Sequence, residues 1–97
     1  MHIIARKSLR EFWVEHPDSE QALKAWFYEA ENAEWKDSGA IKKQYQSASI
    51  IDAERVVFNI RGNRYRLIVR INYSSQTIFI RFIGTHKEYD KINAGEI

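Results

Sequence analysis

Residues 55–83 combine a period of two in apolar side chains with two short turns, and this pattern constrains the fold more than any other feature. Gly62-Asn63 fits a two-residue hairpin turn, because glycine tolerates the positive φ that such turns need. A second turn is predicted at Ser74-Ser75. The last half of the chain is therefore predicted to form two consecutive antiparallel β-hairpins.

The two turns also predict which residues face each other across the strands. The first pairs Asn59 with Arg66, and the second pairs Ile71 with Ile78 and Ile68 with Arg81. Because successive side chains point to opposite faces, one face should form the core, with Val56, Phe58, Ile60, Tyr65, Leu67, Val69, Ile71, Ile78, Ile80 and Phe82. The opposite face should carry Asn59, Arg61, Arg64, Arg66, Ile68, Arg70, Phe79, Arg81 and Ile83.

The first half of the chain is predicted to be mainly helical. Ser8 and Glu11 have the spacing of a capping box, and Pro17 should end the helix that follows. Asp18 is the expected N-cap of a second helix over 19–34, whose apolar side chains recur at helical spacing. Residues 1–4 should form a short edge strand, and 40–45 a helical turn.

These elements predict one α+β domain over residues 1–97, because a chain of this length buries only one modest core. We expect a short N-terminal strand, a helical hairpin and an antiparallel sheet of about four strands. Gly84 is expected to permit a sharp turn after the last strand, and residues 93–97 are expected to be frayed.

Composition excludes some classes of protein. The chain has no cysteine, which excludes disulfides and thiolate metal sites, and its three histidines lack ligand spacing. We therefore expect no metal and no cofactor. No apolar run is long enough for a transmembrane helix, and the N-terminal residues lack the apolar core of a signal peptide, so no membrane association and a cytoplasmic location are expected.

Charge is unevenly distributed along the chain. Residues 1–54 carry seven basic and ten acidic side chains, whereas residues 55–97 carry eight basic and three acidic ones. Such asymmetry is typical of a face that binds a polyanion. The plainer interpretation is that strand surfaces favour arginine while the helices hold the acids. Arg61 should face Arg64, and like charges so placed either separate into solvent or bind an anion.

The predicted basic face could support RNA cleavage without a metal ion. Arginine matches phosphate oxygens, and histidine can serve as acid or base near neutral pH. His86 and Tyr89 follow the last strand, close in sequence to Arg81. Each has a plainer interpretation, because His86 could be a surface histidine and Tyr89 an apolar anchor of the chain end.

Three segments carry a resemblance to a known family: 56–60, 62–67 and 84–91. Together they resemble the HigB toxins of bacterial type II toxin–antitoxin systems, within the RelE-like superfamily. The resemblance implies a RelE-like fold and an mRNA interferase, in many members one that cuts codons in the ribosomal A site. It also implies neutralisation by a HigA-like antitoxin with a helix-turn-helix.

The resemblance assigns residues as well. The family arginine of the second hairpin strand falls on Arg66, the basic residue after the sheet on His86 or Lys87, and the C-terminal aromatic on Tyr89. This chain has Asn59 where better-studied RelE-type members have lysine, and histidine where they have arginine, so the identity of the general base stays open.

The sequence thus predicts a catalytic set and an RNA-binding set. The catalytic set is Arg66, His86, Lys87 and Tyr89, and the RNA-binding set is Asn59, Arg61, Arg64, Arg70 and Arg81. Two alternatives stay open: a non-catalytic module that binds RNA or the ribosome, and a toxin that acts on a protein target such as a topoisomerase.

Overall fold

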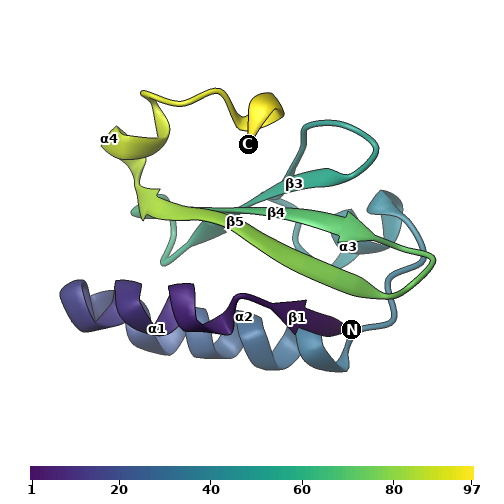
Figure 1. Cartoon of the computed structure of the whole chain (residues 1–97), viewed down its shortest axis with the longest axis horizontal. Helices are drawn as coiled ribbons and strands as arrows, with labels where there is room; N and C mark the ends of the chain where they lie inside the picture. Colours follow the sequence, from purple (N-terminus) through teal and green to yellow (C-terminus); the bar gives the residue numbers. More distant parts are fainter.

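A five-stranded mixed sheet organises the molecule, and the computed structural model describes all residues from 1 to 97. The spatial order of the strands is β1-β5-β4-β3-β2, antiparallel except that β1 runs parallel to β5 (Figure 1). The strands are β1 (His2–Ile4), β2 (Ser49–Ile50), β3 (Arg55–Ile60), β4 (Tyr65–Asn72) and β5 (Thr77–Thr85). The α+β prediction is confirmed, with one strand more than expected, because the two-residue β2 pairs with the edge of β3.

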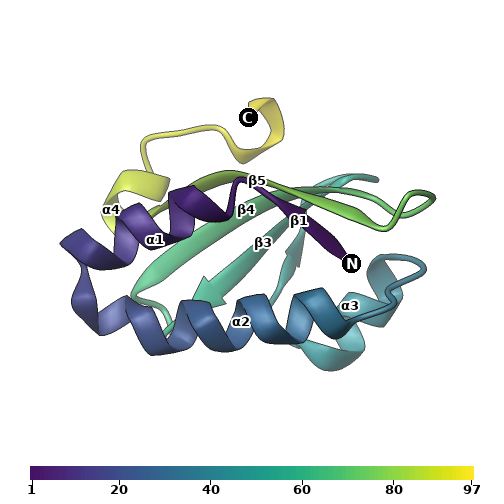
Figure 2. The ribbon, with the colours of Figure 1, turned by 60° about the horizontal axis from the view of Figure 1, so that its bottom comes forward.

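Two long helices lie against one face of this sheet (Figure 2). The helical elements are α1 (Arg6–Glu15), η1 (Pro17–Ser19), α2 (Glu20–Asn32), α3 (Ser38–Gln44), α4 (His86–Tyr89) and η2 (Ala94–Glu96). The predicted helical hairpin is therefore confirmed. None of these helices is long and apolar enough to span a bilayer.

Both predicted N-caps are wrong. Ser8 lies within α1, which begins at Arg6 after Ala5 takes a left-handed conformation, with φ 75°. Asp18 lies in η1 and makes no capping hydrogen bond to α2, because its carboxylate accepts hydrogen bonds from Arg61 and Tyr65 instead. At Asp18 a tertiary contact has therefore replaced the local cap.

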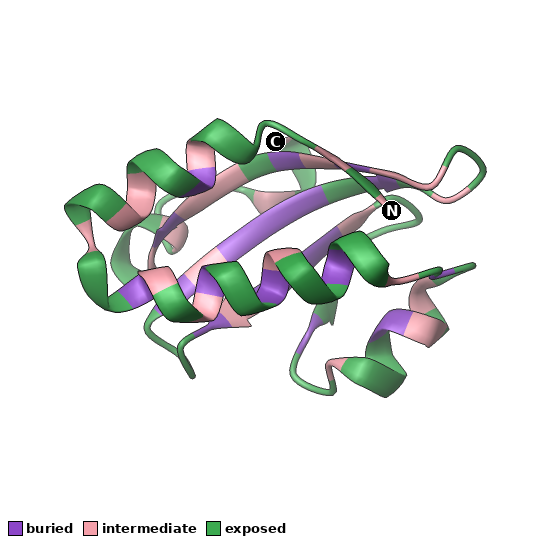
Figure 3. Cartoon of the chain, turned by 90° about the horizontal axis from the view of Figure 1, so that it is seen from below, coloured by how far each residue is buried: buried purple, intermediate pink, exposed green.

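The core lies between the helices and the facing surface of the sheet, where the buried residues gather (Figure 3). Leu9, Leu23 and Ala30 of the helices are fully buried against it. The sheet contributes nine of the ten residues predicted for the core face: Val56, Phe58, Ile60, Tyr65, Leu67, Val69, Ile71, Ile78 and Ile80. Burial of this apolar surface supplies the main driving force for the fold.

The exception is Phe82, and a β-bulge explains it. The predicted pairs of Asn59 with Arg66 and of Ile71 with Ile78 are present. Beyond Ile80 the register shifts by one residue, so that Ile68 faces Phe82 rather than Arg81. A bulge residue reverses the faces of all side chains that follow it in the strand. Ile83 therefore packs against the core, and Phe82 lies on the opposite face.

Gly84 also has a different role from the predicted one. It lies within β5 opposite Arg66, and the strand continues to Thr85 without a turn. A Cβ atom at this position would lie 2.5 Å from Cζ of Phe82. Glycine is therefore needed because the Phe82 ring covers the backbone here.

The C-terminal segment crosses the face of the sheet opposite α1 and α2 (Figure 1). Residues 94–96 form η2 beside β3, and Nε of Arg55 donates a hydrogen bond to the carbonyl of Ile97 at 2.9 Å. The expectation that this segment is frayed is therefore wrong. Its position divides a face that the sequence predicted to be continuous.

Candidate functional site

The face opposite the core consists of three cross-strand rows, each with one residue from β3, β4 and β5. The first row is Asn59, Arg66 and Gly84, the second is Val57, Ile68 and Phe82, and the third is Arg55, Arg70 and Phe79. Ile68 and Val57 are buried, with 0% and 2% of their surface exposed. The apolar second row therefore separates the Arg66 end of the face from the Arg70 end, although the sequence predicted a single basic face.

The first row carries the predicted phosphate-binding arginine. One terminal nitrogen of Arg66 donates to the carbonyls of Asn63 and Tyr65, at 3.0 and 3.4 Å. Its Cζ lies 5.8 Å from the centroid of the Tyr89 ring, within the range of a cation–π contact. These contacts hold the guanidinium at the end of the sheet and leave its other N–H groups free to donate. Asn59 lies beside it on β3.

The second part of the site is α4, which begins where β5 ends. Thr85 and Glu88 form a capping box, in which each side chain accepts a hydrogen bond from the other's backbone N–H. The hydrogen bond from the backbone N–H of Thr85 to the Glu88 carboxylate is the main cause that lowers the pKa of this carboxyl below its usual value. The cap, together with the hydrogen bond from the backbone N–H of His86 to the carbonyl of Arg64 at 3.2 Å, fixes His86 at the start of the helix.

His86 has a carboxylate partner that sequence reasoning missed. Its Nδ1 lies 3.0 Å from Oδ2 of Asp90, one helical turn further on. A carboxylate on one ring nitrogen orients the imidazole and leaves Nε2 to exchange a proton with a ligand. The spacing of four residues on a helix is the signal that could have revealed this pair. Lys87 is exposed and has no ion-pair partner.

The two arginines at the tip of the first hairpin bind an anion within the molecule. Nη1 of Arg61 and Nε of Arg64 lie 2.9 and 3.3 Å from the same carboxylate oxygen of Asp18. The other oxygen accepts a hydrogen bond from the hydroxyl of Tyr65. The Tyr65 hydrogen bond is the main cause that lowers the pKa of Asp18, and the same bond raises the pKa of Tyr65. This Asp18 cluster fastens the hairpin tip, and with it the Arg64 carbonyl that holds His86, to the helical layer.

Asp18→Asn is expected to destabilise the protein in a pH-dependent way. The pKa of Asp18 is lower in the folded protein than in the unfolded chain, so its carboxylate stabilises the fold above pH 4, near the unfolded pKa of about 3.9. That contribution disappears as the pH falls through the folded pKa. Urea midpoints of wild type and Asp18→Asn should therefore differ at pH 6 and converge near pH 2.

Glu34→Gln is the matched control, because Glu34 is exposed and has no ion-pair partner. Its midpoint should follow that of wild type throughout this pH range. An Asp18→Asn midpoint equal to that of wild type at pH 6 would contradict the stabilising role of the cluster.

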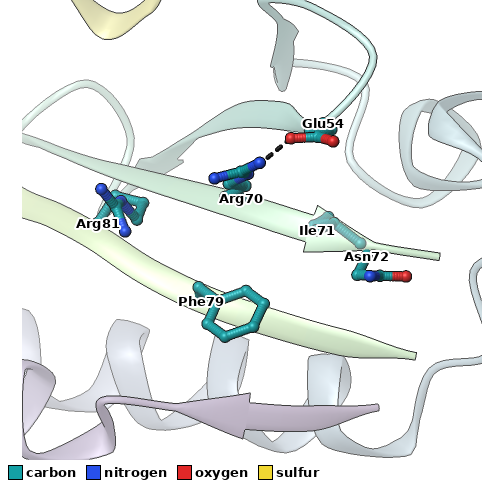
Figure 4. A pocket seen from close by; sticks show the side chains of 6 residues that line it. All are labelled: Glu54, Arg70, Ile71, Asn72, Phe79 and Arg81. Atoms are coloured by element: carbon teal, nitrogen blue, oxygen red, sulfur yellow. Dashed lines mark hydrogen bonds and ion pairs between the residues drawn. The ribbon is translucent and has the colours of Figure 1, made fainter. Parts of the chain in front are cut away.

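The third row carries the two remaining arginines of the predicted RNA-binding set. Nε of Arg70 lies 2.6 Å from Oε2 of Glu54, in the loop before β3. Arg81, at the bulge, has no ion-pair or hydrogen-bond partner in the protein. Both line one hollow at this end of the sheet (Figure 4).

The structure thus divides the nine predicted residues among three places. Arg66, His86, Lys87, Tyr89 and Asn59 belong to the end of the sheet with α4, Arg61 and Arg64 belong to the Asp18 cluster, and Arg70 and Arg81 line the hollow. The first place combines a fixed cation, an aromatic ring and a histidine with a carboxylate partner. That arrangement is suited to acid–base chemistry on a phosphodiester. No three side chains of His, Asp or Glu gather as metal ligands would.

Comparison with known proteins agrees with this chemistry. A family described as HigB_toxin, RelE-like toxic component of a toxin-antitoxin system, matches residues 19–92. The chain is 30% identical over 97 residues to the mRNA interferase toxin HigB of Escherichia coli K12, covering 97% of this chain and 92% of that protein. An mRNA interferase HigB of Escherichia coli O6:H1 is 23% identical over 94 residues, covering 95% and 91%. The chain therefore belongs to the HigB family, the RelE-like toxic components of toxin–antitoxin systems, whose members are paired with an antitoxin.

Proposed function

We propose that this chain is an mRNA interferase, an endoribonuclease that inhibits translation by cutting messages. The proposal rests on the cation–π contact between Arg66 and Tyr89 at the end of the sheet, beside the His86–Asp90 pair. Relatives named mRNA interferase, matched over nearly their whole length, support the same activity.

In the proposed reaction the 2′-hydroxyl of one nucleotide attacks the adjacent phosphorus. A new P–O bond forms, the bond to the 5′-oxygen breaks, and the products carry a 2′,3′-cyclic phosphate and a 5′-hydroxyl. Arg66 binds the non-bridging oxygens, where negative charge accumulates in the transition state. The 2′-hydroxyl loses one proton and the leaving 5′-oxygen gains one. His86 carries one of these transfers through Nε2, with Asp90 holding the ring, and Tyr89 or solvent water carries the other.

The remaining residues of the two predicted sets have supporting roles. Lys87 stabilises charge, and Tyr89 stacks on a base or donates a proton. Asn59, Arg61, Arg64, Arg70 and Arg81 contact the RNA, mainly its backbone. Since Arg61 and Arg64 already share Asp18, and Arg70 pairs with Glu54, their contacts to phosphate compete with an internal carboxylate.

Several finer features belong to the proposal. We infer that cleavage needs no metal ion, since Arg66, His86 and Lys87 supply charge and proton transfer. The substrate is mRNA in the ribosomal A site, which places the toxin in the cytoplasm. The antitoxin is a HigA-like helix-turn-helix protein, in line with the family.

Primer extension on cellular mRNA after brief induction tests this proposal. Wild type should produce discrete cuts within reading frames, and His86→Ala should produce none. Purified toxin should cut messages on programmed ribosomes and leave 2′,3′-cyclic phosphate and 5′-hydroxyl ends.

Growth arrest with an intact message pool would refute the interferase proposal. Products with 5′-phosphate and 3′-hydroxyl ends, which attack by an activated water leaves, would refute attack by the 2′-hydroxyl and with it the metal-independent form.

A further inference from the structure

A hollow of about 320 Å³ lies at the Arg70 end of the sheet, away from α4. Side chains from β4, β5 and the loop before β3 surround it (Figure 4). Its lining residues are Glu54, Arg70, Ile71, Asn72, Phe79 and Arg81. Of these, only Arg70 and Arg81 belong to the predicted RNA-binding set, which gives them contacts with the RNA backbone and no base.

Arg81 is the unpaired cation of this hollow. The register shift makes it the extra residue of β5, between Ile80, which faces Val69, and Phe82, which faces Ile68. The bulge therefore places Arg81 on the same face as Phe82, toward the hollow (Figure 4). An exposed arginine without a carboxylate partner is free to bind a phosphate.

Phe79 supplies an aromatic surface beside this cation. It lies directly opposite Arg70 on the face that α1 and α2 do not cover, and it is only partly buried. It does not belong to the main hydrophobic core. An aromatic ring next to a free arginine is the combination on which proteins stack single-stranded bases.

Glu54 is the one acidic residue that lines the hollow. Its carboxylate holds Arg70 at 2.6 Å, with about half of each side chain exposed, so the pair contributes little to stability. An incoming phosphate would compete with Glu54 for Arg70 and would be repelled by the carboxylate. Glu54 should therefore weaken the binding of an anion in the hollow.

We propose that this hollow is a second subsite for single-stranded RNA, in which a base stacks on Phe79 and its phosphate binds Arg81. The inference rests on the proposed ribonuclease function and extends it along the substrate. Arg66 and Arg70 are four residues apart on β4, which corresponds to about 13 Å at 3.3 Å per residue. About four stacked nucleotides span that distance at 3.4 Å each.

The proposed path between the two subsites runs along β5. Phe82 lies between Arg81 and Gly84, with its ring over the glycine backbone, and offers an aromatic surface midway. The C-terminal η2 contacts β3, which β4 separates from β5 in the sheet.

Equilibrium binding of RNA that cannot be cut tests the subsite directly. Fluorescence anisotropy would measure the affinity of the full chain for a 2′-O-methyl octanucleotide and for a dinucleotide too short to span the sites. Phe79→Leu, which keeps an apolar side chain, should weaken octanucleotide binding about fivefold or more, since it removes the stacking surface. Dinucleotide binding should weaken less, because a dinucleotide can bind beside Arg66 without using the hollow.

Two charge variants add predictions of opposite sign. Arg81→Gln should weaken octanucleotide binding and lower the salt dependence of log K by about one phosphate contact. Glu54→Gln should strengthen binding, an outcome that misfolding cannot produce. Tyr28→Leu and Arg10→Gln are matched controls, because both residues are exposed on the helical layer and should leave binding unchanged.

Octanucleotide affinity equal to that of wild type in both Phe79→Leu and Arg81→Gln would overturn the subsite. So would a loss confined to antitoxin binding, which would assign the hollow to a protein contact. The ribonuclease proposal fails separately, if wild type binds the octanucleotide in this way but yields no cyclic-phosphate products from unmodified mRNA on ribosomes.

Discussion

Arg66→Ala is expected to lower the rate of RNA cleavage by about 10²–10³-fold, the usual effect of removing one donor that stabilises a developing oxyanion. Arg66 is suited to this role because two backbone carbonyls and the Tyr89 ring already fix its guanidinium. A cation held in place before the substrate arrives needs no reorganisation during the reaction. Single-turnover cleavage of mRNA on saturating ribosomes measures the effect.

Arg66→Lys and Arg10→Ala are the controls for this result. Lysine keeps the charge but loses the planar set of donors, so its rate should fall between those of wild type and Arg66→Ala. Arg10 is exposed on α1, far from the first row, and its loss should not change the rate. Arg66 makes no ion pair in the protein, so circular dichroism of Arg66→Ala should match wild type. Wild-type cleavage by Arg66→Ala would remove this residue from the catalytic set.

The register of the sheet could be predicted because two independent turns agreed on it. Gly62 takes a φ of 65°, as the first turn requires, and the N–H of Arg64 donates to the carbonyl of Arg61. The pairs of Asn59 with Arg66 and of Ile71 with Ile78 follow from these turns by counting.

The bulge could not be predicted in this way. It follows Ile80, and Phe82 and Ile83 after it are both apolar, so the pattern of apolar residues is the same whichever of them faces the core. The packing of Ile83 against the core shows which alternative the chain adopts. The sequence therefore did not predict this shift of one residue. The shift places Arg81 and Phe82 together on the open face.

The ion-pair partners of the arginines could not be predicted from local sequence patterns either. Asp18 meets Arg61 and Arg64 only because the turn between α1 and α2 lies beside the tip of the first hairpin. The plainer interpretation of the charge asymmetry, with acids on the helical half and arginines on the strands, describes this cluster. It does not describe Arg66 and Arg81, which have no carboxylate partner.

The pairing of His86 with the Asp90 carboxylate leads to specific predictions for variants of both residues. His86→Ala should lower the single-turnover cleavage rate by about 10²–10⁴-fold, the range for loss of a general acid or base. Asp90→Asn should cause a smaller loss, since it leaves the imidazole in place but weakens the contact of 3.0 Å that orients it.

The double variant distinguishes a positioning role of Asp90 from a separate contribution. If Asp90 acts only through His86, adding Asp90→Asn to His86→Ala should cause no further loss of rate, because the two residues work as a unit. Additive losses would mean that Asp90 affects cleavage independently of the ring, for example through the end of α4, where it follows Tyr89. Glu96→Gln, which removes an exposed carboxylate elsewhere in the C-terminal segment, should leave the rate unchanged. A wild-type rate for His86→Ala would instead assign proton transfer to another group, and Tyr89 and Lys87 of the same short helix would be the next residues to replace.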